Sequence, residues 1–156
     1  MNLNQIEACA KECERQQSGE MSVAWLCEAF DVLYYRTKNL WTGFRFADLT
    51  ETGKMVTILD LGMIVEPGKN RNGFRNVPAT FRNGNSAIPA ENIKRALASL
   101  VNNMHGMSAV DFYTEFEKIH PFVDGNGRVG FLLYNLINNT LENPAVPPDV
   151  FSNKRT

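Results

Sequence analysis

The segment from His120 to Arg128, HPFVDGNGR, holds residue types that together can act on a phosphate ester. An imidazole, a carboxylate, a Gly-Asn-Gly turn and a guanidinium fall within one short loop. A helix that starts at the turn would offer unpaired backbone N–H groups to an anion, and glycines let a backbone approach that anion closely. The segment therefore predicts a binding site for a polyphosphate and its metal ion, next to a general base.

Each group in this segment suits one part of that chemistry. His120 is one of only two histidines in the chain, so it is the candidate for a general base that takes a proton from an incoming hydroxyl. Asp124 offers an oxygen ligand of the kind that Mg²⁺ takes alongside substrate phosphates. Arg128 can bridge phosphate oxygens with its planar fork. Further contacts to phosphate are expected from the turn, with the Asn126 amide included: Gly125, Asn126 and Gly127.

The composition limits the class of protein. At 156 residues and 44% hydrophobic residues, the chain is expected to fold as one domain without disulfides, and its three cysteines are expected to be reduced thiols. A formal net charge of −1 gives no global attraction to nucleic acid or to anionic lipid. No stretch is long enough to span a membrane, and the N-terminus lacks a secretory signal. A cytoplasmic protein is expected, although non-classical export would leave no such mark.

Most of the chain has the pattern of helices. A polar helix rich in Glu and Lys is expected over about 3–17, and a buried helix is expected over 21–35, where apolar residues recur at helical spacing. The apolar stretch 56–65 can be a strand or a core helix, and periodicity alone does not decide between them. The proline-containing tail, 141–156, is expected to be irregular.

Two helices are expected to hold the phosphate-binding segment between them. Ser108 is the expected N-cap of the first, which should stop near His120 because Pro121 disfavours helical backbone in the residue before it. The second should begin near Asn126 or Gly127. The base would then lie at the end of one helix, and the anion seat at the start of the next.

A segment rich in Asn, Arg and Gly precedes these helices. Residues 76–81 and 86–88 have the pattern of short extended pieces, and the Asn-Gly-Asn at 83–85 is a turn signal. The sequence therefore predicts a β-hairpin on the surface, followed by a helix that starts at Pro89. The expected fold class is all-α with one short β-hairpin.

The nine residues 120–128 match the core signature of the Fic domain family, H-x-F-x-(D/E)-G-N-G-R-x-x-R. A weaker resemblance extends over about residues 55–138, whereas the N-terminal helices over 1–50 carry none. The resemblance implies one mainly helical Fic-like domain over 1–156, with the hairpin as the part called the flap. Phe122 would be the buried anchor of the motif.

The resemblance also implies an activity. Most members of the family transfer AMP from ATP to a Ser, Thr or Tyr hydroxyl of a target protein, with Mg²⁺ as cofactor. Carried over by motif, His120 is the base, Asp124 binds Mg²⁺ and Arg128 contacts phosphate together with the Gly-Asn-Gly turn. The flap would hold the backbone of the target protein as an added strand, through Val77, Pro78, Ala79, Thr80 and Phe81.

The chain departs from the family pattern at the second arginine, which is Phe131 here. Its loss implies weaker nucleotide binding, a different diphosphate-containing donor, or a contact supplied from elsewhere. Arg75, Arg82 and Lys118 are the candidates for that contact. Phe131 can also be simply a core residue.

Regulation and alternative functions follow from two further comparisons with the family. The inhibitory signature (S/T)-x-x-x-E-(G/N) is absent from the chain, so inhibition either comes from a separate antitoxin-like protein or is not used. Relatives transfer UMP, phosphate or phosphocholine, and the intact Gly-Asn-Gly argues against the phosphate-transferring toxins called Doc. A non-catalytic binding module is supported by Phe131 and opposed by the retained His120 and Asp124.

Overall fold

The computed structural model describes residues 1–37 and 45–150, and within them the chain is helical. The expected connector at 41–43 lies outside these residues. The α-helices are α1 (Leu3–Arg15), α2 (Glu20–Thr37), α3 (Glu51–Val65), α4 (Ile93–Asn102), α5 (Ala109–Ile119) and α6 (Asn126–Ile137). Short 3₁₀ helices precede two of them, at Phe46–Asp48 and Ala90–Asn92.

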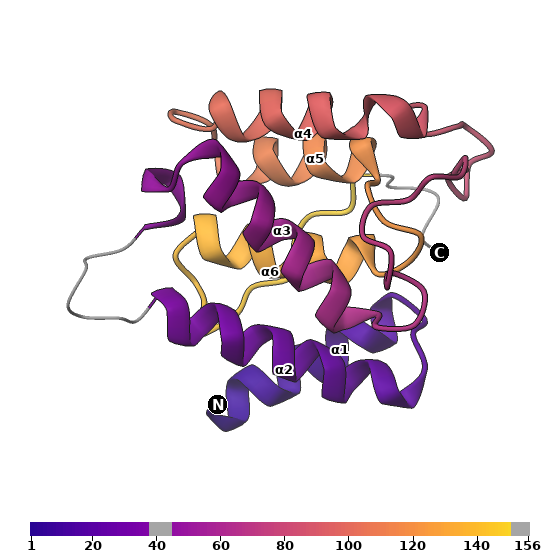
Figure 1. Cartoon of the computed structure of the whole chain (residues 1–156). Helices are drawn as coiled ribbons and strands as arrows, with labels where there is room; N and C mark the ends of the chain where they lie inside the picture. The colour runs from indigo at the N-terminus through magenta and orange to yellow at the C-terminus, as the bar shows by residue number, and fades with distance from the viewer. Residues whose placement is uncertain (38–44, 151–156) are drawn as a thin grey trace.

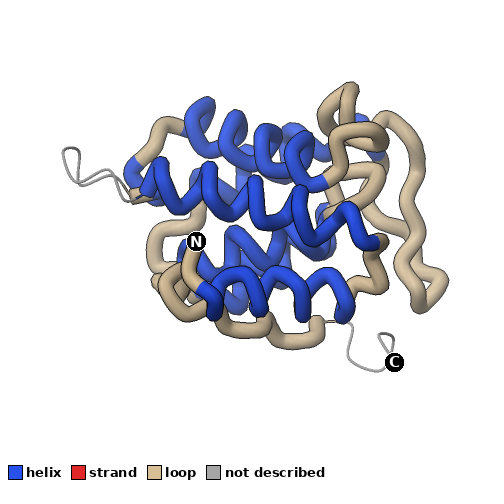
Figure 2. The backbone as a smooth tube through the Cα atoms, turned by 90° about the horizontal axis from the view of Figure 1, so that it is seen from below, coloured by secondary structure: helices blue, strands red, loops and turns tan. Residues whose placement is uncertain are grey.

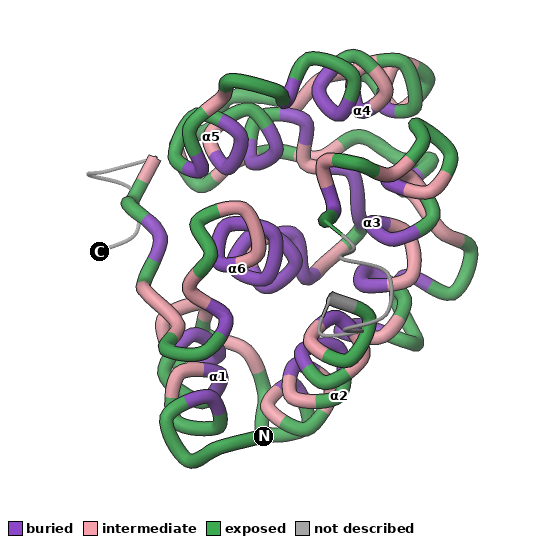
Figure 3. The backbone as a smooth tube through the Cα atoms, turned by 90° about the vertical axis from the view of Figure 1, so that its left-hand side faces the viewer, coloured by how far each residue is buried: buried purple, intermediate pink, exposed green. Residues whose placement is uncertain are grey.

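Helix α6 is the centre of the molecule, and the other helices surround it (Figures 1 and 3). It contacts α1, α2, α3 and α5, and most of its residues are buried. A helix that is apolar on nearly all sides is stable only when its neighbours cover every face. The sequence 129–133, VGFLL, meets this condition and places α6 in the core.

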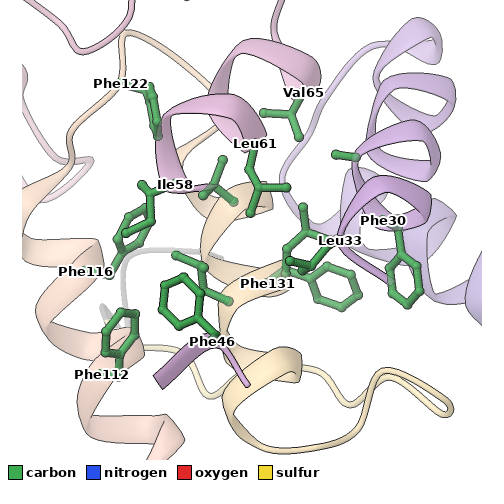
Figure 4. Packing of buried hydrophobic residues seen from close by; sticks show 14 of the residues in the cluster. Phe30, Leu33, Phe46, Ile58, Leu61, Val65, Phe112, Phe116, Phe122 and Phe131 are labelled. Carbon is green, nitrogen blue, oxygen red and sulfur yellow. The ribbon is translucent and has the colours of Figure 1, made fainter. Parts of the chain in front are cut away.

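The core also decides the role of Phe131. Its side chain is 1% exposed and packs in the same cluster as Phe30 and Leu33 of α2 (Figure 4). The residue that replaces the second arginine of the motif is therefore a core residue, as one of the alternatives predicted.

The ambiguous stretch 56–65 is part of α3. Thr50 caps this helix, because its Oγ1 accepts a hydrogen bond of 3.0 Å from the N–H of Gly53. Ile58, Leu61 and Val65 follow at helical spacing and enter the core. At 15 residues, α3 is longer than most strands, and its N-cap lies six residues before the ambiguous stretch.

The predicted ends of the two helices around the motif are confirmed. The Asp111 N–H donates to Ser108 Oγ at 3.0 Å, which caps α5. Helix α5 ends at Ile119 with His120 as its C-cap, and α6 begins at Asn126. A side-chain cap marks the start of α5, whereas α6 begins after Gly125 with no side-chain cap.

The predicted β-hairpin is wrong in one respect. Residues 76–88, which we call the flap, turn back on themselves, but no strand forms in the described part of the chain (Figure 2). The pairing is one isolated antiparallel bridge, Thr80–Ser86, with a further bond from the Ala87 N–H to the Ala79 carbonyl at 2.9 Å. Pro78 and Pro89 lack the N–H groups that would extend the ladder.

The tail is irregular over 141–150, as predicted, and residues 151–156 lie outside the described part. The Asn135 side chain ties this tail to α6, since its amide exchanges hydrogen bonds of 2.7 and 3.0 Å with the Ala145 backbone. None of the helices described is both long and apolar enough to cross a membrane.

Candidate active site

A cavity of about 250 Å³ lies where the flap, the motif loop and the end of α1 meet. These three segments gather at the right-hand end of the helices in Figure 1. The flap contributes residues 80–82, the motif segment contributes His120 and residues 123–128, and α5 contributes Glu117. The remaining wall comes from the end of α1 and the turn after it, through Arg15, Gln16 and Ser18.

His120 has an unusual backbone conformation. Its φ of 52° and ψ of 62° are left-handed, which costs a residue with a side chain roughly 1–3 kcal/mol and persists only where the surroundings hold it. Its N–H still bonds to the Phe116 carbonyl at 3.1 Å, and its own carbonyl accepts from Arg75 Nε at 2.6 Å. These bonds hold the turn that puts the imidazole on the cavity wall.

The surroundings of the imidazole keep it neutral. Burial lowers the pKa of His120, and the positive charge of Arg75 lowers it further, against weaker opposing effects of the Glu117 backbone and Asp124. Nδ1 is buried and makes no hydrogen bond of good geometry in the described structure. The Phe81 ring of the flap meets the imidazole edge to face, with centroids 5.2 Å apart. An unprotonated imidazole in this position can accept a proton.

Asp124 lies beside His120 in the same cavity and is held by cations. Lys69 Nζ is 2.7 Å from Oδ2, and Arg128 Nη2 is 3.6 Å from Oδ1. Burial alone would raise the pKa of Asp124, but the bonds from Lys69 and from the Gly125 N–H, with the two positive charges, lower it overall. The carboxylate is therefore ionised at neutral pH.

Asp124 is the carboxylate predicted to bind Mg²⁺, and it lines the cavity together with Glu117. Within residues 1–37 and 45–150, no group of three or more His, Cys, Asp or Glu side chains is placed to hold a metal. Mg²⁺ commonly binds through one or two carboxylates, with substrate phosphates and water as the other ligands. The site fits an ion that arrives with a phosphate donor, rather than one held in a preformed cage.

The start of α6 presents backbone N–H groups to the cavity. Gly125 is the N-cap in a left-handed conformation, with φ of 80°, and no side chain caps the helix. The first intrahelical bond runs from the Val129 N–H to the Gly125 carbonyl, so the N–H groups of residues 126–128 have no intrahelical acceptor. The Gly125 N–H is engaged by Asp124 at 2.7 Å. The positive end of the helix dipole adds to this seat for an anion.

The side chain of Asn126 has a different role from the predicted amide contact to phosphate. Its Oδ1 accepts from the Phe122 N–H at 2.8 Å, and its Nδ2 donates to the Phe122 carbonyl at 2.9 Å. Both ends of the amide thus close the motif loop on itself. The backbone N–H of Asn126, rather than its side chain, is therefore the group left to contact a phosphate.

Arg128 is also bound within the protein. It is 2% exposed, and it donates to the Val65 carbonyl and to Glu66 Oε1, each at 3.0 Å. These bonds join α6 to the C-terminal end of α3. Arg128 borders the cavity, and a contact with phosphate would share a guanidinium already engaged by Glu66.

Phe122 is fully buried, as predicted for the anchor of the motif. Its ring lies against Gly62 of α3, where an added Cβ would come within 2.1 Å of it. Asn70 holds the other side of the loop, because its Nδ2 donates to the carbonyls of Gly62 at 2.9 Å and Asp124 at 2.8 Å. Sequence analysis missed Asn70 and Lys69, since neither lies in a motif of its own.

The three candidates for the missing arginine contact are placed very differently. Arg75 is 3% exposed and donates to backbone carbonyls, including those of Val77 at 2.9 Å and Ile88 at 2.7 Å at the base of the flap. Lys118 pairs with Glu115 at 3.3 Å and does not line the cavity. Arg82 does line it, as does Arg15 of α1, which sequence analysis did not consider.

The flap borders the cavity with part of the segment predicted to dock a target. Thr80 and Phe81 line the cavity. Val77, Pro78 and Thr80 are exposed, whereas Ala79 and Phe81 are half-buried. Docking of a target strand here stays a prediction.

Comparison with known proteins agrees with the motif. The family model described as the Fic/DOC family matches residues 53–137, which is more than half of the chain. The chain is also similar to a curated protein of Aquifex aeolicus named "Probable protein adenylyltransferase", with 37% identity over 90 residues. That match covers 47% of this chain and 28% of the relative, so the chain spans well under half of the relative's length. No solved structure matches the chain. With the family model covering both the motif and the helices that position it, the chain belongs to the Fic/DOC family.

Proposed function

We propose that the protein is a Mg²⁺-dependent adenylyltransferase that moves AMP from ATP to a Ser, Thr or Tyr hydroxyl of a target protein. The observation that carries this proposal is the meeting of a neutral imidazole, an ionised carboxylate and an uncapped helix N-terminus in one cavity. Family membership and the name of the Aquifex relative support it. A cytoplasmic setting is part of the proposal.

His120 acts as the general base in this reaction. Because Nδ1 is buried, Nε2 is the ring nitrogen assigned to take the proton of the target hydroxyl. The hydroxyl oxygen then forms a bond to the α-phosphorus of ATP, while the bond from that phosphorus to the pyrophosphate oxygen breaks. The lowered pKa of His120 keeps the imidazole able to accept the proton at neutral pH.

The start of α6 binds the donor. The backbone N–H groups of residues 126–128 and the helix dipole stabilise the negative charge that builds up on the phosphate oxygens. Mg²⁺, when bound through Asp124, would neutralise phosphate charge and orient the leaving pyrophosphate. The flap residues Val77–Phe81 hold the target backbone next to the imidazole.

The test uses Mg²⁺, α-labelled ATP and a lysate or the protein itself as target. Wild type is expected to transfer the label to protein, and His120→Ala is expected to lose this transfer by roughly 10²-fold or more. His105→Ala is the matched control, because His105 is the other histidine and is exposed outside the cavity. Equal labelling by wild type and His120→Ala would refute the proposed base.

Two alternatives give distinct results in the same experiment. A Fic-type transferase with another donor would label protein from UTP, from γ-labelled ATP or from a phosphocholine donor instead. A non-catalytic binding module would show a thermal shift with nucleotide and no label at all. Phe131 favours neither alternative, because its burial in the core explains why an apolar residue stands at this position. A separate antitoxin-like inhibitor would appear as a partner that suppresses the labelling.

A further inference from the structure

Among the residues that the structure describes, neither of the two motif positions that carry an arginine in the family supplies an unengaged guanidinium to the cavity. The position of the second motif arginine is Phe131, which is buried in the core. Arg128 is engaged by Glu66 and by the Val65 carbonyl. The outer phosphates of a nucleoside triphosphate carry most of its charge, so a site for them needs a cation from another element.

The end of α1 places a cation on the cavity wall. Arg15 is the last residue of α1, and its Nε and Nη2 donate to the two oxygens of Glu12 at 2.8 and 2.6 Å. The Glu12 side chain is 1% exposed, whereas that of Arg15 is 24% exposed and lines the cavity. The pair therefore holds a guanidinium in a fixed orientation, with the carboxylate behind it. This arrangement reduces the entropy lost when the guanidinium binds a ligand.

The same end of α1 contacts the anion seat directly. Gln16 lies so close to Gly127 that an added Cβ there would come within 2.2 Å of Gln16 Oε1. The Gln16 amide is itself held by Glu12 at 2.8 Å. Glu12 thus positions both Arg15 and Gln16 against the start of α6. This contact places the end of α1 beside the start of α6.

We infer that Arg15 binds the outer phosphates of the nucleotide donor, in place of the arginine that the motif lacks at position 131. Helix α1 is then part of the donor site, although it lies outside the residues that the family model matches. The inference rests on the proposed function only for the class of donor, a nucleoside triphosphate. Arg82 is the rival, but it is exposed on the flap and donates a long hydrogen bond of 3.3 Å to Gln17 Oε1.

The test measures binding rather than transfer. Titration calorimetry with Mg²⁺ would use ATP and UTP analogues with a methylene group between the α- and β-phosphorus, and AMP as a ligand without outer phosphates. Arg15→Ala is expected to bind the triphosphate analogue at least about tenfold more weakly, with little change for AMP. Arg15→Lys is expected to recover part of this loss, because it keeps the charge but not the fork.

Two controls separate binding from folding. Arg36→Ala removes an arginine that pairs with Asp60 away from the cavity, and it is expected to bind both ligands as wild type does. Because Arg15→Ala leaves the buried Glu12 with the Gln16 amide but without a cation, the double variant Glu12→Gln with Arg15→Gln removes both charges together. It is expected to fold and to show the same selective loss for the triphosphate.

The outcomes are distinguishable from those of the proposed function. Equal weakening for AMP and the triphosphate, or a selective loss in Arg82→Ala but not in Arg15→Ala, would overturn the inference. Absence of triphosphate binding by the wild type would overturn it as well. A wild type that binds the analogue through Arg15 but transfers no AMP would support the inference and refute the adenylyltransferase.

Discussion

At the scale of single residues, nearby positive charge lowers the pKa of both chemical groups of the cavity, with opposite consequences for their charge. His120 is largely buried and near the positive charge of Arg75, so its pKa falls and the imidazole stays neutral. Asp124 is surrounded by Lys69, Arg128 and the Gly125 N–H, so its pKa falls and the carboxylate stays ionised. One group can therefore accept a proton while its neighbour keeps the charge that a metal ion needs.

The pKa of His120 predicts the acid side of the pH profile. A base with a lowered pKa is active when unprotonated, so kcat/KM should be level near pH 7 and fall only below pH 6.5. Below the pKa the decline should approach about tenfold for each pH unit. The measurement is labelled-AMP transfer across a pH series at saturating Mg²⁺. An acid limb with a midpoint above 6.5 would contradict a buried base.

The ion pair between Lys69 and Asp124 predicts the response to Mg²⁺. The Lys69 ammonium is 2.7 Å from Oδ2 of Asp124, the oxygen that a metal ion would need. Lys69→Ala should therefore lower the Mg²⁺ concentration for half-maximal activity by several-fold, because it removes a competitor. Lys118→Ala, which breaks an exposed pair with Glu115, is the control and should leave that concentration unchanged. A higher Mg²⁺ requirement in Lys69→Ala would show that Lys69 assists the donor instead.

At the scale of elements, Arg75 joins the flap to the end of α5. Its guanidinium donates to the His120 carbonyl at 2.6 Å, to Val77 at 2.9 Å and to Ile88 at 2.7 Å. Its backbone N–H adds a bond of 2.8 Å to the Pro121 carbonyl. The flap contains no strand, so these bonds from Arg75 hold its two ends together in place of the backbone hydrogen bonds of a hairpin. They also support the left-handed conformation of His120.

Replacement of Arg75 should cost both stability and activity. In Arg75→Ala, partly buried carbonyls at both ends of the flap lose their donor, which should lower the free energy of unfolding by about 2–4 kcal/mol. Urea unfolding measures this loss, and AMP transfer by the remaining folded protein should drop further because His120 is no longer held. Arg71→Ala, an exposed arginine of the same loop, should change the unfolding free energy by less than about 0.5 kcal/mol. A similar loss of unfolding free energy in both variants would show that Arg75 does not hold the flap to the end of α5.

At the scale of the whole molecule, α6 serves the core and the site at once. Its first turn is the proposed anion-binding site, and the rest of the helix packs against α1, α2, α3 and α5 (Figure 3). The seat is rigid because the helix behind it is enclosed on all sides. The same enclosure leaves no room for a charged side chain at position 131.

Restoring the family arginine should therefore damage the protein. Phe131→Arg would bury a guanidinium in the cluster of Phe30 and Leu33, at a cost of about 3 kcal/mol or more. Phe131→Leu, a smaller apolar replacement, should cost about 1–1.5 kcal/mol and keep activity. Thermal unfolding and AMP transfer of the two variants provide the measurement. A stable and more active Phe131→Arg would show that the position can face the donor.

The sequence by itself determined the helix ends that present the motif, and it predicted the chemistry of the motif. Ser108 and Pro121 act on their immediate neighbours, so the limits of α5 could be predicted from local rules. The same locality explains why His120 and Asp124 were found. The tertiary structure decided what depends on residues far apart in the chain: the burial of Phe131, the bonds of Arg75 to the flap, and the pairing of Lys69 with Asp124. Arg15 reaches the cavity only because α1 packs on α6, and no local pattern encodes the contact of Gln16 with Gly127, which lies more than a hundred residues away.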